Sequence, residues 1–121
     1  MRIPGAHGRF EDLKVWQKAQ DLGVFIYETT DIGELAKDYG IRNQIRRASL
    51  SISSNIDEGQ GRYSSKEFRN YLSIANGSVY EVISLIHFAG RLRLIEKDVA
   101  SMIILNCTEI SKMIKGLRNS L

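Results

Sequence analysis

Proline is almost missing from this chain of 121 residues, in which Pro4 is the single example. No residue from 5 to 121 is therefore barred on that ground from the interior of a helix, and long helices are permitted throughout. Cysteine is equally scarce. Cys107 stands alone, which excludes an internal disulfide and a cysteine metal cluster and is consistent with a reducing cytoplasm.

Long hydrophobic runs are missing as well. No stretch approaches the roughly 18 apolar residues that a membrane span needs. The amino terminus carries Arg2 and Arg9 around a short polar stretch and lacks the apolar segment of a secretory signal. The composition, with 43% apolar and 26% charged residues, is that of an ordinary folded domain. We therefore expect a cytoplasmic protein with no membrane partner.

The sequence also lacks the residue patterns on which an enzyme would depend. His7 lies near the amino terminus, and we expect a packed or hydrogen-bonded structural role for His87. No Glu-x-x-His pair of the di-iron bundles occurs. Gly59-Gln60-Gly61 is not followed by the Gly-Lys-Ser/Thr of a phosphate-binding loop. We therefore predict no catalytic residue, no metal site and no cofactor.

What the chain does have is helical periodicity, most clearly in residues 41–63. Apolar residues recur there at steps of three and four and form one stripe of a helix. At the same rotation Arg42 falls beside this stripe, while Arg46 and Arg47 point away from it. Two glycines are expected to end the helix in a left-handed cap. The stripe is Ile41, Ile45, Ala48, Ile52 and Ile56, and the glycines are Gly59 and Gly61.

Three further segments have the same periodicity: residues 10–30, 64 to about 90, and 96–117. Ser64 and Glu67 form a capping box at the start of the third helix, and small residues at Gly77 and Ser78 would let another helix approach closely. Residues 34–38 fit either a separate helical turn or the start of the second helix. We predict a flexible arm over residues 1–9 and, over 10–121, a single all-α domain, an antiparallel up-and-down four-helix bundle.

Three groups of residues resemble the 23S rRNA intervening-sequence protein family, the small four-helix-bundle proteins of bacteria. They are Phe10 to Ala19; Gln44-Ile45-Arg46-Arg47-Ala48 with Ser51-Ile52, Asn55-Ile56 and Glu58-Gly59; and Ala75-Asn76-Gly77-Ser78 with Glu81. Ser53 and Asp57 stand where proline and alanine are usual in the family.

This resemblance implies the same fold and a link to 23S rRNA or its processing. A related branch resembles the accessory variability proteins of diversity-generating retroelements, which implies a homopentamer and a reverse transcriptase as a possible partner. A surplus of apolar residues on the first helix agrees with a subunit interface. These residues are Val15, Leu22, Val24 and Phe25.

The functional candidates are cationic, in a chain of net charge +3. Arginine binds phosphate through paired N–H groups, and an exposed tyrosine can stack on a base. We predict a non-enzymatic, oligomeric protein that binds 23S rRNA, its intervening sequence or another structured RNA. The alternative is a protein-interaction scaffold, such as a reverse-transcriptase accessory, whose arginines form salt bridges between subunits. The predicted nucleic-acid-binding residues are Arg42, Arg46, Arg47, Arg62, Tyr63, Lys66 and Arg69, with Arg91 and Arg93 as further cations.

Three polar residues of the family-like pattern are expected to serve the fold. We interpret Glu58 and Glu81 as carboxylates that hold a loop or pair with an arginine such as Arg46 or Arg62. The Asn55 side chain is expected to bind backbone or a neighbouring helix.

Overall fold

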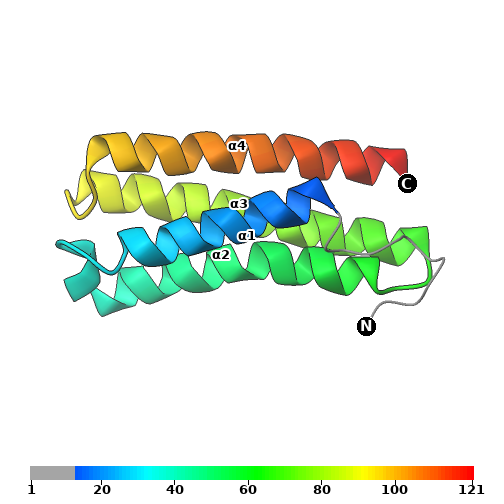
Figure 1. Cartoon of the computed structure of the whole chain (residues 1–121), viewed down its shortest axis with the longest axis horizontal. Helices are drawn as coiled ribbons and strands as arrows, with labels where there is room; N and C mark the ends of the chain where they lie inside the picture. The colour runs from blue at the N-terminus through cyan, green and yellow to red at the C-terminus, as the bar shows by residue number, and fades with distance from the viewer. Residues whose placement is uncertain (1–12) are drawn as a thin grey trace.

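The computed structural model describes residues 13–121 as four helices that run alternately in opposite directions (Figure 1). α2 packs against α1 and α3, and α4 packs against α3 and α1. The described residues contain no strand, so the predicted all-α four-helix bundle is confirmed. The predicted arm, residues 1–9, lies outside the described residues. The elements are α1 (Lys14–Thr29), the 3-10 turn η2 (Leu35–Lys37), α2 (Tyr39–Gln60), α3 (Ser65–Arg91) and α4 (Lys97–Ser120).

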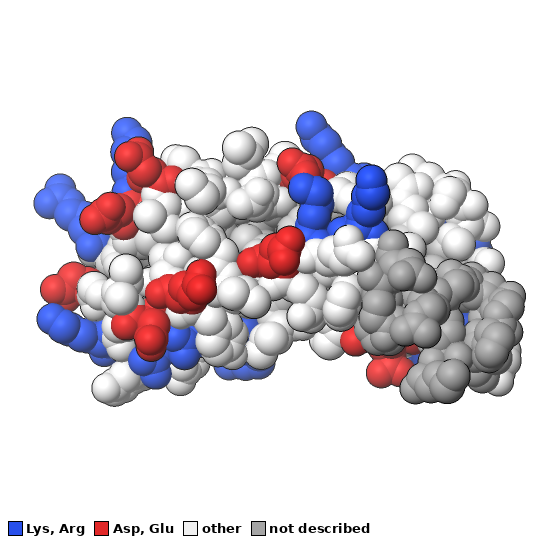
Figure 2. Space-filling model, in the orientation of Figure 1, with Lys and Arg blue, Asp and Glu red and all other residues white. Residues whose placement is uncertain are grey.

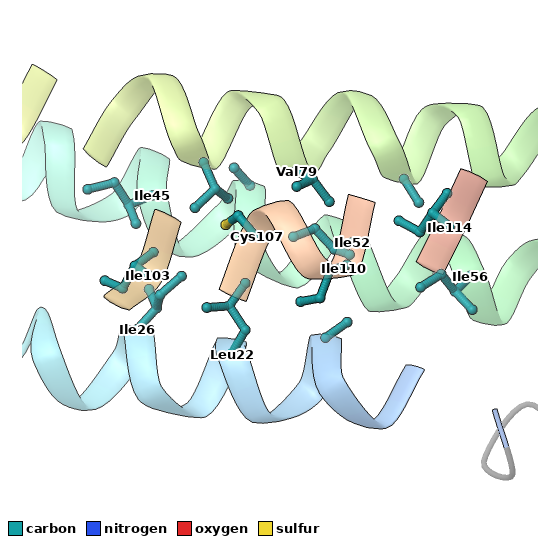
Figure 3. Close-up of a cluster of buried hydrophobic side chains, with 14 of the residues drawn as sticks. Leu22, Ile26, Ile45, Ile52, Ile56, Val79, Ile103, Cys107, Ile110 and Ile114 are labelled. Atoms are coloured by element: carbon teal, nitrogen blue, oxygen red, sulfur yellow. The ribbon is translucent and has the colours of Figure 1, made fainter. Parts of the chain in front are cut away.

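The core lies on the axis of the bundle, where each helix contributes one apolar side (Figure 3). In the predicted α2 stripe, Ile45, Ile52 and Ile56 are completely buried, whereas Ile41 at its beginning is half-buried. Cys107 of α4 also lies in this core. Burial raises the pKa of its thiol to about 12, so the side chain behaves as a small neutral apolar group.

The connection between α1 and α2 resolves the alternative that the sequence leaves open. Residues 35–37 form a separate 3-10 turn, and α2 begins at Tyr39. Asp38 caps α2, because its side-chain oxygen accepts a hydrogen bond from the Ile41 N–H at 3.1 Å.

The predicted role of the glycines at the end of α2 is wrong. Gly61 has a right-handed φ of −75°, and Gly59 lies inside the helix. A Cβ added at Gly59 would lie 2.6 Å from the Cβ of Tyr71 and 3.0 Å from the Cδ1 of Phe68. Gly59 is therefore needed because α3 comes too close for any side chain. Gly77, where we expected a close approach, faces open space instead.

Both ends of α3 are fixed by local hydrogen bonds. The Ser64 hydroxyl accepts from the Glu67 N–H at 3.1 Å, which confirms the predicted start. After α3 the chain turns through Arg93, whose φ is 59°. The Leu94 N–H donates to the Ala89 carbonyl at 2.9 Å, and the Arg93 N–H donates to the Gly90 carbonyl at 3.0 Å. This is the Schellman arrangement, with arginine where glycine is usual.

Among the described residues, α3 is long and apolar enough to cross a membrane, judged by length and composition alone. A core helix of a soluble protein meets the same criterion, so the observation is weak evidence. In the bundle, the apolar side of α3 packs against the other helices.

The close contact at Gly59 gives a first prediction. Replacing Gly59 by alanine should destabilise the protein by about 1–3 kcal/mol, because α2 and α3 must separate to admit the methyl group. Gly116→Ala is the matched control. Nothing lies within 4 Å of a Cβ at that position of α4, so the change should stabilise the protein by up to about 1 kcal/mol. Urea unfolding measures both, and a neutral Gly59→Ala would contradict the close approach.

Candidate nucleic-acid interface

The predicted binding residues fall into two groups at opposite ends of α2. Arg42, Arg46 and Arg47 lie in its first turns, beside the connection from α1. The others lie around the turn from α2 to α3. Arg46 and Arg62 are separated by about 24 Å at the rise of an α-helix. On the face shown in Figure 2, Lys and Arg side chains lie among Asp and Glu, and no large area carries one sign.

Arg46 joins α2 to the end of α1. Its Nε donates to the Thr30 hydroxyl at 2.8 Å, and its Nη2 donates to the Tyr27 carbonyl at 3.2 Å. The Asp31 carboxylate lies 3.7 Å from the same nitrogen, and the Arg46 side chain is 18% exposed. Thr30 is itself buried and donates to the Ile26 carbonyl. Arg46 points away from the core stripe, as predicted, but it points toward α1.

Arg42 supports the neighbouring connection, whereas Arg47 does not. The Arg42 Nη1 donates to the Ala36 carbonyl in η2 at 3.0 Å, and its guanidinium lies 4.6 Å from the centre of the Tyr39 ring. Arg47 is exposed and forms no hydrogen bond or ion pair with another described residue. In this group, Arg47 is the arginine whose donors are available to a partner.

Arg62 occupies the other end of α2. Its Nη2 donates to the Tyr71 hydroxyl at 2.7 Å and to the Glu58 carboxylate at 3.1 Å. This confirms that Glu58 pairs with an arginine at the helix end. Glu81, in contrast, is exposed and forms no hydrogen bond or ion pair with any other residue from 13 to 121.

A short polar chain crosses from α2 to α3 between these two ends. The Asn55 amide donates to the carbonyl of Ser51 at 2.8 Å and to its hydroxyl at 2.9 Å. The Ser78 hydroxyl donates to the Ser51 hydroxyl at 2.9 Å. The prediction that Asn55 binds backbone is therefore confirmed.

Three further predicted residues surround the α2–α3 turn. Tyr63 is 75% exposed, Lys66 is exposed and Arg69 is half-buried, and none of the three bonds to another described residue. The sequence analysis missed Arg118, whose Nε donates to the Ser73 hydroxyl at 2.9 Å. In an antiparallel bundle the fourth helix must end beside the start of the third. This topology would have placed Arg118 near the predicted binding residues. We call this region the turn surface: Arg62, Tyr63, Lys66, Arg69 and Arg118.

Two other expectations need correction. His87 is exposed rather than packed, because it lies on the outer side of α3. Val15 and Leu22 are buried, so they are not part of an outward apolar surplus on α1; of the four residues named, Val24 is exposed and Phe25 is half-buried. α1 contacts both α2 and α4, and these two contacts account for its broad apolar side.

Within residues 13–121, no three His, Cys, Asp or Glu side chains gather in a group that could hold a metal ion. On the outer side of α3 and α4, Lys115 donates to the Tyr80 hydroxyl at 2.9 Å. This hydrogen bond is the main reason that the pKa of Tyr80 is lowered.

The family model of the 23S rRNA-intervening sequence protein matches residues 11–116. The chain belongs to this family. A solved structure from Bacteroides thetaiotaomicron, described as a protein of unknown function from the S23 ribosomal protein family, has a TM-score of 0.81 and 25% sequence identity. The match covers 87% of this chain and 95% of the Bacteroides chain. No curated protein matches the sequence.

The contacts of Arg46 give a second prediction. Arg46→Gln should destabilise the protein by about 1–3 kcal/mol, because Thr30 and the Tyr27 carbonyl lose their donors. Arg47→Gln changes the same charge one residue away and should alter the free energy of unfolding by less than about 0.5 kcal/mol. Thermal unfolding of both variants measures the difference. Equal stability of the two would refute the structural role of Arg46.

Proposed function

We propose that this protein is a non-enzymatic, cytoplasmic, oligomeric bundle that binds structured RNA, in particular 23S rRNA or its intervening sequence, through the turn surface. The observation that carries this proposal is the exposed Tyr63 ring, which stands beside cations with available donors. The name of the family, which refers to 23S rRNA, agrees with it.

The chemistry of the turn surface suits RNA. Lys66 and Arg69 have no partner among the described residues, so their charges are available to phosphates. Four cations, with Asp57, Glu58 and Glu67 as the neighbouring carboxylates, leave a net charge of +1. Tyr63 offers an aromatic face on which a base in a loop or bulge can stack. Arg62 contributes charge, while its Tyr71 and Glu58 contacts hold it in place.

Stacking on Tyr63 gives a third prediction. Tyr63→Ala should weaken binding to a labelled 23S rRNA fragment that contains the intervening sequence by about 5-fold to 150-fold, as expected for about 1–3 kcal/mol per stacked base. Tyr63→Phe keeps the ring and should retain the affinity. Fluorescence anisotropy measures both.

The cations of the turn surface are tested in the same experiment across a salt series. The double variant Lys66→Gln with Arg69→Gln should reduce the slope of log affinity against log salt by about 1 to 2. Lys37→Gln with Arg91→Gln removes the same charge at the opposite end of the bundle and should leave the slope unchanged. If the unmodified protein does not bind the RNA at low salt, the proposal is wrong. If the two double variants change the slope equally, the binding is nonspecific electrostatic attraction and does not use the turn surface.

The scaffold alternative has an observation of its own, an apolar stripe on the outer side of α3. Ile74, Phe88 and Leu92 are exposed, and Leu85 between them is half-buried. Their spacing places them on one face of the helix with Glu81. Exposed apolar groups in a row are typical of a subunit interface. We propose that copies of the chain associate through this stripe; a pentamer and a reverse-transcriptase partner follow from the resemblance.

Arg47 and Glu81 fit such an interface as a charged pair. Because Ser51 meets Ser78 and the two helices are antiparallel, Arg47 and Glu81 lie at about the same level along the bundle. Both are exposed, and they form no salt bridge with each other within one chain. Each is therefore available to the opposite charge of a neighbouring copy.

Association through α3 gives a fourth prediction. The double variant Ile74→Ser with Phe88→Ser should reduce the mass measured by light scattering to that of a smaller species, while the helical circular dichroism stays unchanged. Met102→Ser with Leu105→Ser removes exposed apolar groups from α4 and should leave the mass as it is. If the α4 variant dissociates and the α3 variant does not, the interface lies on α4.

A further inference from the structure

A cavity of about 900 Å³ lies at the end of the bundle opposite the turn surface. It is formed where the connection between α1 and α2 faces the connection between α3 and α4, which lie at the same end of the bundle in Figure 1. Its volume is within the range of pockets that bind small molecules. The turn surface and the apolar stripe of α3 take no part in it, whereas Arg91 and Arg93, named above as further cations, line it.

The walls of the cavity are mainly apolar and come from separate elements. Ile32 of the connection between α1 and α2 is exposed, and Leu94 and Ile95 of the other connection and Val99 of α4 are half-buried. Leu35 and Ile86 also belong to the lining but have at most 1% of their surface exposed. Aliphatic walls from several directions suit an aliphatic chain, which leaves water when it enters.

The charged residues of the cavity have an excess of cations. Arg91, Arg93 and Lys97 are opposed by Glu34 and Glu96, which leaves a net charge of +1 from these five side chains. Glu34 also lies 3.6 Å from the Lys37 amine, which partly compensates its charge. The cavity therefore favours a ligand with one negative charge.

The start of α4 adds to this preference. The side chain of its N-cap residue, Glu96, accepts no hydrogen bond from the backbone N–H groups of the first turn. The first N–H groups of this long helix thus have no side-chain cap, and they lie where Glu96 and Lys97 line the cavity.

Arg93 provides an independent observation. It occupies the left-handed position of the Schellman turn at a φ of 59°, a conformation that glycine adopts without strain and that side chains disfavour. Glycine would close the turn more easily. Arginine at this position instead adds a cationic residue to the lining of the cavity, and strained residues of this kind gather at binding sites.

We propose that this cavity binds a medium-chain aliphatic carboxylate. The alkyl chain lies between Ile32, Leu94 and Val99, and the carboxylate faces Arg93 and Lys97. The proposal is independent of RNA binding and of assembly, because it uses neither the turn surface nor the outer stripe of α3.

Titration calorimetry with decanoate below its micellar concentration tests the charge preference. Decanoate should bind with one molecule per chain and at least tenfold more tightly than decyltrimethylammonium, which has an alkyl chain of similar length and the opposite charge. Decanol, which is neutral, should bind more weakly than decanoate. Absence of decanoate binding, or equal affinity for the three compounds, would overturn the proposal.

Two variants locate the site. A Cβ at Gly90 meets nothing within 4 Å, and Gly90 lines the cavity, so Gly90→Leu should occupy the space and abolish binding. Gly116→Leu, at an equally open position on α4 outside the cavity, should bind decanoate normally. Normal binding by Gly90→Leu would place decanoate elsewhere and overturn the assignment.

Arg93→Gly separates binding from folding. Glycine suits the left-handed turn, so thermal stability should stay the same or increase. Loss of the cation should weaken decanoate binding by about twofold to fivefold, the effect of an exposed charge pair, and leave decanol binding unchanged. Unchanged decanoate affinity in this variant would mean that Arg93 does not contact the carboxylate and would refute its role.

Discussion

The close contact between α2 and α3 is the constraint on which the rest of the structure depends. Gly59 removes the side chain that would hold the two helices apart, and the hydroxyl pair Ser51 and Ser78 sets their register farther along. The hydroxyl pair and the missing side chain at the closest approach add to the apolar packing, and together they favour one register of the two helices. The position of Tyr63 in the following turn, and the alignment of Arg47 with Glu81, both follow from this register.

The arginines of α2 divide according to what their donors already bind. Arg42 and Arg46 satisfy carbonyl and hydroxyl groups at the end of α1 and in η2, and so they fix that connection to α2. A guanidinium engaged in this way would have to break those bonds to grip a phosphate, which costs stability. Arg47, Lys66 and Arg69 form no such hydrogen bond with a described residue. Function in this family member is therefore best sought among the cations that the fold does not use.

The sequence was sufficient to predict what depends on local pattern: four helices, the capping box at Ser64 and the core stripe of α2. It could not predict what depends on long-range approach. In the sequence, a glycine at the end of a helix such as Gly59 looks like a helix cap. Only the position of Tyr71 in the structure shows that Gly59 is needed for close packing. Arg118 joins the turn surface through the end of a different helix. The cavity is likewise made by two connections that are distant in sequence.

The three proposed surfaces are compatible because they lie on different parts of an elongated bundle. The apolar stripe runs along the outer side of α3, whereas the turn surface and the cavity lie at its two ends. Association through α3 about an axis roughly parallel to the helices would bring every turn surface to one rim of a closed ring and every cavity to the other. Several weak contacts on one rim could then hold a single RNA through multivalency, which is consistent with the modest charge of one chain. The proposed assembly would therefore support the proposed RNA binding rather than compete with it.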